Sequence, residues 1–182
     1  GVEFDIVNVE ELDGIEVGKL EGYSYRQALG FLAQLLAGYV RFNHRGFLQI
    51  RKLNVAEYDI KTDEYFSKGL TKNGIRYKVR GITCVVPNDD EPEELFVGIK
   101  KGPQIQIENP LMTQELLQSI FDELQEVDYY PFDLEWRGNP AIEVGDLVTV
   151  YDTEGNQMRV PNLNYELTYN GGLTATSSAD TK

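Results

Sequence analysis

The stretch that decides the fold is DLEWRGNPAIEVGDLVTV, residues Asp133–Val150. It begins as an extended segment that contains the only tryptophan, Trp136, and it turns at Gly138-Asn139-Pro140. It turns again at Gly145-Asp146 and leaves along a strand with alternating residues. This order is typical of a strand that enters and leaves a corner of a small β-barrel. Trp136 is therefore predicted to be a packing anchor, and Gly145 to take a backbone angle that other residues disfavour.

The residues that follow this stretch predict a meander of short strands. Asp152–Asn156 is predicted to be a hairpin tip, followed by strands at Gln157–Pro161, Asn164–Tyr169 and Leu173–Ser177. The residues before it predict an amphipathic helix, in which Asn109 is the N-cap and Pro110 the first helical residue. The apolar face of this helix is formed by Leu116, Leu117, Ile120, Phe121, Leu124 and Val127.

A second helix is indicated in the first quarter of the chain. Ser24 and Gln27 have the spacing of a capping box, and Gly38 is placed to end the helix. A strand with alternating residues is expected before it at Val2–Val9. A hairpin is expected after it, with Asn43-His44-Arg45-Gly46 as the turn.

The middle of the chain predicts further strands. Thr62-Asp63-Glu64 indicates a short helical turn closed by Gly69. A long strand is expected over Ile75–Val86, bent at Gly81. Two shorter strands are expected at Leu95–Ile99 and Gln104–Ile107, after an acidic loop.

The order of strands, helix, strands, helix and strands predicts an α+β fold rather than alternating βαβ units. We expect mixed and antiparallel, β-barrel-like sheets with two amphipathic helices packed on them. Three regions are expected: an N-terminal strand and acidic loop over residues 1–22, a helix-hairpin-strand region over 23–104, and a helix with closing strands over 105–182. Together they are predicted to form one compact fragment of a longer protein.

Composition limits the classes of function. The chain has 182 residues, 41% of them hydrophobic, and a net charge of −13. The charge is uneven, because residues 22–88 carry eleven Lys and Arg against four Asp and Glu, whereas residues 89–182 carry five against nineteen. Such an acidic surface repels nucleic-acid and membrane phosphates. No apolar run is long enough to predict a transmembrane helix, and no signal segment opens the chain.

Residues with catalytic or metal-binding chemistry are sparse. The only histidine, His44, lies on a predicted hairpin turn, and the only cysteine, Cys84, lies in an apolar run that predicts burial. Asp133 and Glu135 share one face of a strand and form the best carboxylate pair for a glycosidase. The Asp152–Asn156 tip has acidic residues but lacks the spacing of an EF-hand loop. No catalytic, cofactor-binding or metal-binding residue is assigned, and no cofactor is expected.

Several stretches together resemble a known family. They are YSYRQALGFLAQLLAGYVRFNHRGFLQI (Tyr23–Ile50), IENPLM (Ile107–Met112), FDLEWRGNPAIEVGDLVTVYDTEGN (Phe132–Asn156) and LTYNGGLTATSSA (Leu167–Ala179). They resemble tail hub proteins of long-tailed phages and prophages of Gram-positive bacteria, relatives of the baseplate hub and late control D proteins. The acidic segment Glu3–Glu21 and the loop Pro87–Glu94 lie outside this resemblance.

The resemblance implies a non-catalytic structural protein of the virion tail, present in the host cytoplasm during assembly. In that family a homotrimeric ring caps the tail tube, contacts other tail and baseplate proteins, and opens so that DNA passes without specific binding. Two alternatives remain open from the residues themselves. One is a carbohydrate- or receptor-binding module of the tail tip that uses Tyr129, Tyr130 and Trp136 as a ligand or interface surface. The other is a cell-wall hydrolase that uses Asp133 and Glu135.

Overall fold

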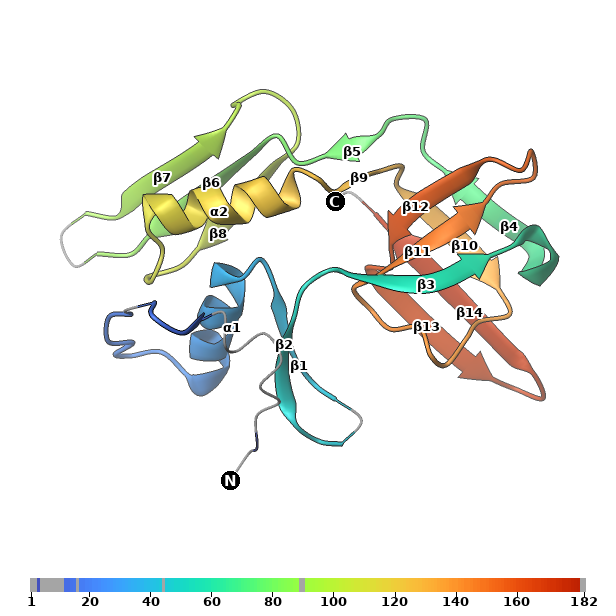
Figure 1. Ribbon diagram of the computed structural model, residues 1–182, viewed down its shortest axis with the longest axis horizontal. Coiled ribbons are helices and arrows are strands. Elements are labelled where there is room, and N and C mark those ends of the chain that lie inside the picture. The colour runs from blue at the N-terminus through green and yellow to red at the C-terminus, as the bar shows by residue number, and fades with distance from the viewer. Residues whose placement is uncertain (1–2, 4–11, 16, 44, 89–90, 181–182) are drawn as a thin grey trace. The chain divides into compact units, whose positions relative to one another are not determined.

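A computed structural model describes residues 3, 12–15, 17–43, 45–88 and 91–180, with only the backbone of residues 54–57. The strand expected at Val2–Val9, apart from Glu3, and the histidine His44 lie outside the described residues. The chain forms two compact units (Figure 1). Unit 1 contains Gly1–Lys52 and Val79–Val127, and unit 2 contains Leu53–Lys78 and Asp128–Lys182. Two helices and many short strands confirm the predicted α+β class.

Helix α1 of unit 1 spans Tyr25–Leu35. Its N-terminus is the predicted capping box, because the Ser24 side chain accepts a hydrogen bond from the Gln27 backbone and the Gln27 side chain accepts one from the Ser24 backbone. The helix is followed by the predicted hairpin of antiparallel strands β1 (Tyr39–Phe42) and β2 (Leu48–Arg51). Gly46 in its turn has a positive φ of +80°.

The end of helix α1 differs from the prediction by one residue. Ala37 has φ of +51°, and its N–H donates to Gln34 while the N–H of Gly38 donates to Ala33. This is a Schellman motif in which alanine occupies the left-handed position. Gly38 is required for a different reason, since a Cβ there would lie 2.7 Å from the carbonyl oxygen of Arg51.

The second segment of unit 1, Val79–Val127, contains a three-stranded sheet and a helix. Strands β6 (Gly81–Val86), β7 (Glu93–Gly98) and β8 (Gln104–Glu108) lie in the order β7-β6-β8, with β6 antiparallel to β7 and parallel to β8. Helix α2 (Gln114–Leu124) packs along this sheet (Figure 1). The core of this region includes the fully buried Ile82, Cys84 and Leu117.

The predicted start of α2 was wrong. The N-cap is Thr113, whose side chain accepts from the N–H of Leu116, and not Asn109. Asn109 is fully buried, and its side-chain amide donates to the carbonyl oxygen of Phe31 and to the side chain of Gln34, both in α1. Its side-chain oxygen accepts from the N–H of Leu111. It therefore ties the end of β8 to α1 instead of beginning a helix.

The long strand expected over Ile75–Val86 was also wrong. It is divided into β5 (Tyr77–Lys78), which pairs with β9 (Asp128–Tyr129) in unit 2, and β6, which belongs to unit 1. Gly81 does not bend one strand; it is the first residue of the second one. A Cβ on Gly81 would lie 3.0 Å from the Val97 carbonyl oxygen. Strand β7 therefore leaves little room for a side chain at this position of β6.

Unit 2 contains two larger sheets. One has the order β13-β14-β10-β4, formed by Asn164–Tyr169, Leu173–Ala179, Phe132–Trp136 and Tyr65–Lys72. The other has the order β12-β11-β3, formed by Gln157–Pro161, Asp146–Tyr151 and Asn54–Ile60. The described strands form open sheets, so the fold is not a closed barrel.

The helical turn predicted at Thr62 is present as a 3₁₀ turn at Thr62–Glu64. It is followed at once by strand β4, which was not predicted. Gly69, however, does not close this turn. It lies inside β4 with φ of +58°, opposite the point where the register between β10 and β4 shifts, and therefore belongs to an irregularity of the strand.

Candidate functional site

Trp136 lies at the centre of unit 2. The alternation of β10 buries Phe132, Leu134 and Trp136 on one face. The Trp136 ring has no exposed area, and its Nε1–H donates to the hydroxyl of Ser177 on β14 at 3.0 Å. The ring centroid of Tyr58, on β3, lies 6.0 Å away, so Trp136 packs between the two sheets.

The turn after Trp136 is held closely against β13 and β14. Gly138 has φ of +79°, and a Cβ there would lie 2.7 Å from the side chains of both Ala175 and Leu167. The Tyr165 hydroxyl accepts from the N–H of Asn139 and donates to its carbonyl oxygen, both at 2.9 Å. One phenol therefore satisfies both backbone groups of the turn residue.

The second turn leads directly into β11. Gly145 has φ of +90°, and its N–H donates to the carbonyl oxygen of Asn162 at 2.8 Å. The buried Asp146 carboxylate accepts from the N–H of Glu143 at 2.8 Å, while its carbonyl oxygen accepts from the N–H of Asn162. Both turns of the Asp133–Val150 stretch thus combine a glycine of positive φ with hydrogen bonds to the backbone of the turn.

The three aromatic residues proposed as a ligand surface lie in different environments. Trp136 is fully buried and Tyr129 is 5% exposed. Burial raises the pKa of Tyr129 to about 12, with smaller contributions from Tyr77 and Asp180. Tyr130 is half-buried beneath the Arg76 guanidinium, which lies 5.4 Å from its ring centroid. A sugar stacks on an exposed ring face, and neither Trp136 nor Tyr129 offers one.

The carboxylates of β10 point to the opposite face from Trp136. Glu135 forms a surface ion pair with Lys68 of β4 at 2.9 Å, and this hydrogen bond raises the pKa of Lys68. Glu135 also lines a shallow groove of about 300 Å³ on this face, together with Phe66, Glu166, Thr168, Thr174, Ala175 and Thr176. Asp133 does not line it. This groove therefore contains only one of the two carboxylates that were predicted as a pair.

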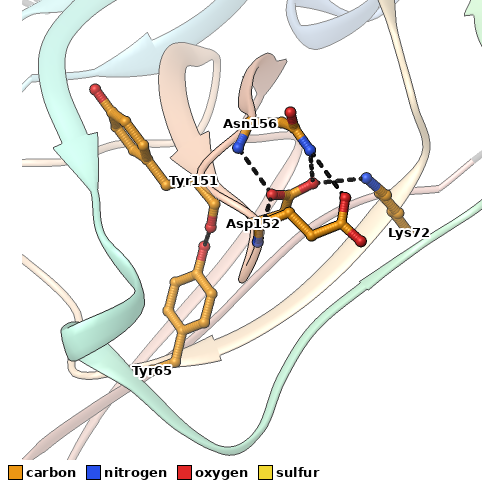
Figure 2. A network of polar contacts seen from close by, with 6 residues as sticks. Tyr65, Lys72, Tyr151, Asp152 and Asn156 are labelled. Atoms are coloured by element: carbon orange, nitrogen blue, oxygen red, sulfur yellow. Dashed lines mark hydrogen bonds and ion pairs between the residues drawn. The ribbon is translucent and has the colours of Figure 1, made fainter.

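A network of polar contacts lies at the β11–β12 hairpin tip of unit 2 (Figure 2). One oxygen of Asp152 accepts from the N–H groups of Glu154 and Asn156, and the other accepts from the Asn156 side chain and from Lys72 Nζ. These donors, led by the side chains of Asn156 and Lys72, hold the pKa of Asp152 well below its usual range.

The same tip is joined to β4 by a second contact. The Tyr65 hydroxyl donates to the carbonyl oxygen of Tyr151, and burial raises the pKa of Tyr65 to about 12 (Figure 2). Donors surround both oxygens of Asp152, so the tip is a cross-link between β4 and the β11–β12 hairpin. Among the described residues, no group of three His, Cys, Asp or Glu side chains could hold a metal ion.

The sequence indicated the hairpin tip but not the Asp152 network. Lys72 is 80 residues away from Asp152, and no local pattern links the two. The free cysteine, Cys84, is buried as predicted, and burial raises the pKa of its thiol. The site is thus a set of packing, turn and hairpin contacts centred on β10 and β11.

Comparison with solved structures identifies the class of fold. A 43 kDa tail protein of prophage MuSo2 from Shewanella oneidensis matches with a TM-score of 0.51 and 16% identity, over 89% of this chain and 56% of that one. A tail protein from Neisseria meningitidis MC58 matches with a TM-score of 0.49 and 12% identity, over 89% and 57%. Prophage tail protein gp18 from Listeria monocytogenes EGD-e matches with a TM-score of 0.43 and 14% identity, over 83% of this chain and 52% of that one.

The first of these likenesses places the chain in a fold that a prophage tail protein also has. This chain spans slightly more than half the length of each of the three proteins. No family model and no curated protein matches the sequence. Within the described residues, no helix is long and apolar enough to cross a membrane.

Proposed function

We propose that this chain is a structural module of a phage or prophage tail, located in the hub or tip at the end of the tail tube. The observation that carries the proposal is the shared fold with the Shewanella tail protein over 89% of this chain. The resemblance of Tyr23–Ile50 and Phe132–Asn156 to tail hub sequences supports it from the residues alone. The module acts in assembly with other tail proteins and in DNA ejection, as a homotrimer in the particle.

The charge of the protein is compatible with a place beside passing DNA. Both units contribute to the net charge of −13. Unit 1 has seventeen Asp and Glu residues against nine Lys and Arg, and unit 2 has thirteen against eight. A negatively charged wall repels phosphates, so DNA moves past it without being bound. This supports a tail-tube position and argues against a DNA-binding role.

The chemistry of the site supports a structural, non-catalytic role. Glu135 is paired with Lys68, Asp152 is surrounded by donors, and Trp136 is buried. These groups stabilise turns and join strands. The proposed locations are the virion tail and, while tails assemble, the host cytoplasm.

The location can be tested on purified particles from the producing bacterium. Mass spectrometry of the particles should find peptides of this chain. Antibodies against it should label one end of the tail in electron micrographs. Absence of the peptides from particles would refute the tail assignment. Labelling along the shaft or on the capsid would refute the hub or tip assignment and leave the tail assignment in place.

A further inference from the structure

The four-stranded sheet of unit 2 has two edges, formed by β4 and β13. Within the described part of the chain, β4 pairs only with β10 and β13 only with β14. An edge strand presents N–H and C=O groups that can pair with another strand. A hollow of about 430 Å³ is lined by Tyr65–Leu70 and Lys72 of β4 and by Asp152–Glu154 of the hairpin tip.

The two edges carry opposite charges. Strand β4, YFSKGLTK, contains Lys68 and Lys72 and no acid, whereas β13, NYELTY, contains Glu166 and no base. Lys72 is held by Asp152, but the Lys68 side chain is 80% exposed and its partner Glu135 lies at the surface. Such an exposed ion pair is worth little, so Lys68 can exchange its partner at small cost.

Exposed apolar side chains accompany both edges. Phe66 of β4 is 39% exposed. At the other edge, Tyr169 of β13 is 77% exposed and lies opposite the exposed Leu173 of β14. Leu167 of β13 is also exposed. An edge that presents both backbone groups and apolar side chains is typical of an interface between strands of different chains.

The direction of the strands makes the two edges compatible. All three neighbouring pairs in the sheet are antiparallel, so β13 and β4 run in opposite directions. If copies are related by rotation about an axis along the strands, β4 of one copy meets β13 of the next in antiparallel orientation. The pairing therefore continues the alternation already present within each copy.

From these four observations we propose that β4 of one copy pairs with β13 of a second copy, head to tail. Lys68 then lies near Glu166 of the neighbouring copy, and repeated contacts of this kind close into a ring. The expectation that three copies close the ring rests on the proposed function. The pairing of the two edges rests on the charges and directions of the strands themselves.

Charge exchange tests the pairing in the full chain. Light scattering over a concentration series should give about three times the chain mass of 20.7 kDa. Lys68→Glu and Glu166→Lys should each weaken association at least tenfold, because each places like charges across the interface. The double variant should restore it. A chain that stays monomeric at all concentrations would overturn the inference.

The same experiment separates head-to-tail pairing from a twofold dimer through β13 alone. In such a dimer Lys68→Glu would leave association unchanged, and this result would also overturn the inference. Circular dichroism checks that each variant is folded. The outcome is independent of whether particles contain the chain, so a failed tail assignment and a failed edge pairing are distinguishable.

Cross-linking provides a second measurement that keeps Lys68 and Glu166 in place. Ser67→Cys on β4 and Thr168→Cys on β13 are made in separate chains and treated with a flexible bis-maleimide. The mixture should cross-link in pairs, and each variant alone should not. The unsubstituted chain is the control, since Cys84 is fully buried. Cross-linking of either variant with itself, or none in the mixture, would contradict head-to-tail pairing.

Discussion

The two units bury their cores by different means. In unit 1, helix α2 covers a three-stranded sheet and contributes the fully buried Leu117. In unit 2, side chains from two sheets meet, and Trp136 is the largest fully buried side chain. Helix ends depend on short-range capping contacts, whereas the sheet contacts of unit 2 join residues far apart in the chain. The two units should therefore respond differently to local and to long-range changes.

The stabilities of the two units can be measured separately, because each unit contains a different spectroscopic probe. In the part of the chain that the structure describes, both α-helices, α1 and α2, lie in unit 1, so far-ultraviolet circular dichroism at 222 nm follows that unit. The only tryptophan, Trp136, lies in unit 2, so its fluorescence follows the other unit. One denaturation experiment with two probes reports on each unit separately.

The largest effect is expected for Leu117→Ala in unit 1. Removing a fully buried leucine side chain leaves a cavity and should reduce the free energy of unfolding by roughly 3–4 kcal/mol. The denaturant midpoint measured by circular dichroism should fall more than the midpoint measured by fluorescence. Leu134→Ala, in the core of unit 2, is the matched variant and should show the reverse order. Equal shifts of both probes would mean that the units unfold as one.

A smaller effect is expected for Gly138→Ala in unit 2. The new Cβ would lie 2.7 Å from Ala175 and Leu167 and would also require a positive φ. We expect a loss of roughly 2–3 kcal/mol, read from Trp136 fluorescence during urea unfolding.

Gly155→Ala is the control for backbone conformation. Gly155 has φ of +84°, but among the described residues, apart from its two chain neighbours, no atom lies within 4 Å of the site of its Cβ. This variant should lose only about 1 kcal/mol, the cost of the left-handed conformation. If the two glycine variants lose the same amount, the close approach at Gly138 is not important for stability.

The hairpin tip predicts a dependence on pH within unit 2. Because the pKa of Asp152 is lower in the folded chain than in the unfolded one, its contribution is present above about pH 4. It is lost as the pH falls below that value through the folded pKa. Asp152→Asn should lower the Tm seen by fluorescence by roughly 5 °C at pH 7 and by less at pH 3. Asp13→Asn, in unit 1, should leave this pH difference unchanged.

Local patterns predicted the elements that depend on neighbours in sequence. The Ser24 capping box, the Gly46 hairpin turn and the alternation of β11 were all recognisable because their contacts span a few residues. Asn109 has the local pattern of an N-cap, but its amide bonds to Phe31 and Gln34, 78 and 75 residues away. A local signal could not distinguish these two uses of one side chain.

The same limit applies to the strands and the candidate site. Ile75–Val86 reads as one alternating strand, yet its two halves pair with strands of different units. The burial of Trp136 was predicted from its surroundings. Its hydrogen bond to Ser177, and the hydrogen bonds of Tyr165 to the backbone of Asn139, depend instead on the order of strands in the sheet. Sheet order is set by contacts between distant segments, which is why the turns of the site were predicted and their partners were not.

The smallest effect is expected at the end of α1 in unit 1, where Ala37 takes a positive φ of 51°. Glycine adopts this conformation without the steric cost that an alanine Cβ incurs. Ala37→Gly should therefore stabilise the helix end, offset by the larger entropy of glycine in the unfolded chain, with a net gain of about 0.5 kcal/mol. The gain should appear in circular dichroism and not in Trp136 fluorescence. Gly30→Ala, in the middle of the same helix with open space around its Cβ, should stabilise by about 1 kcal/mol through helix propensity alone. A loss of stability in Ala37→Gly would show that the Ala37 side chain contributes packing that outweighs its backbone strain.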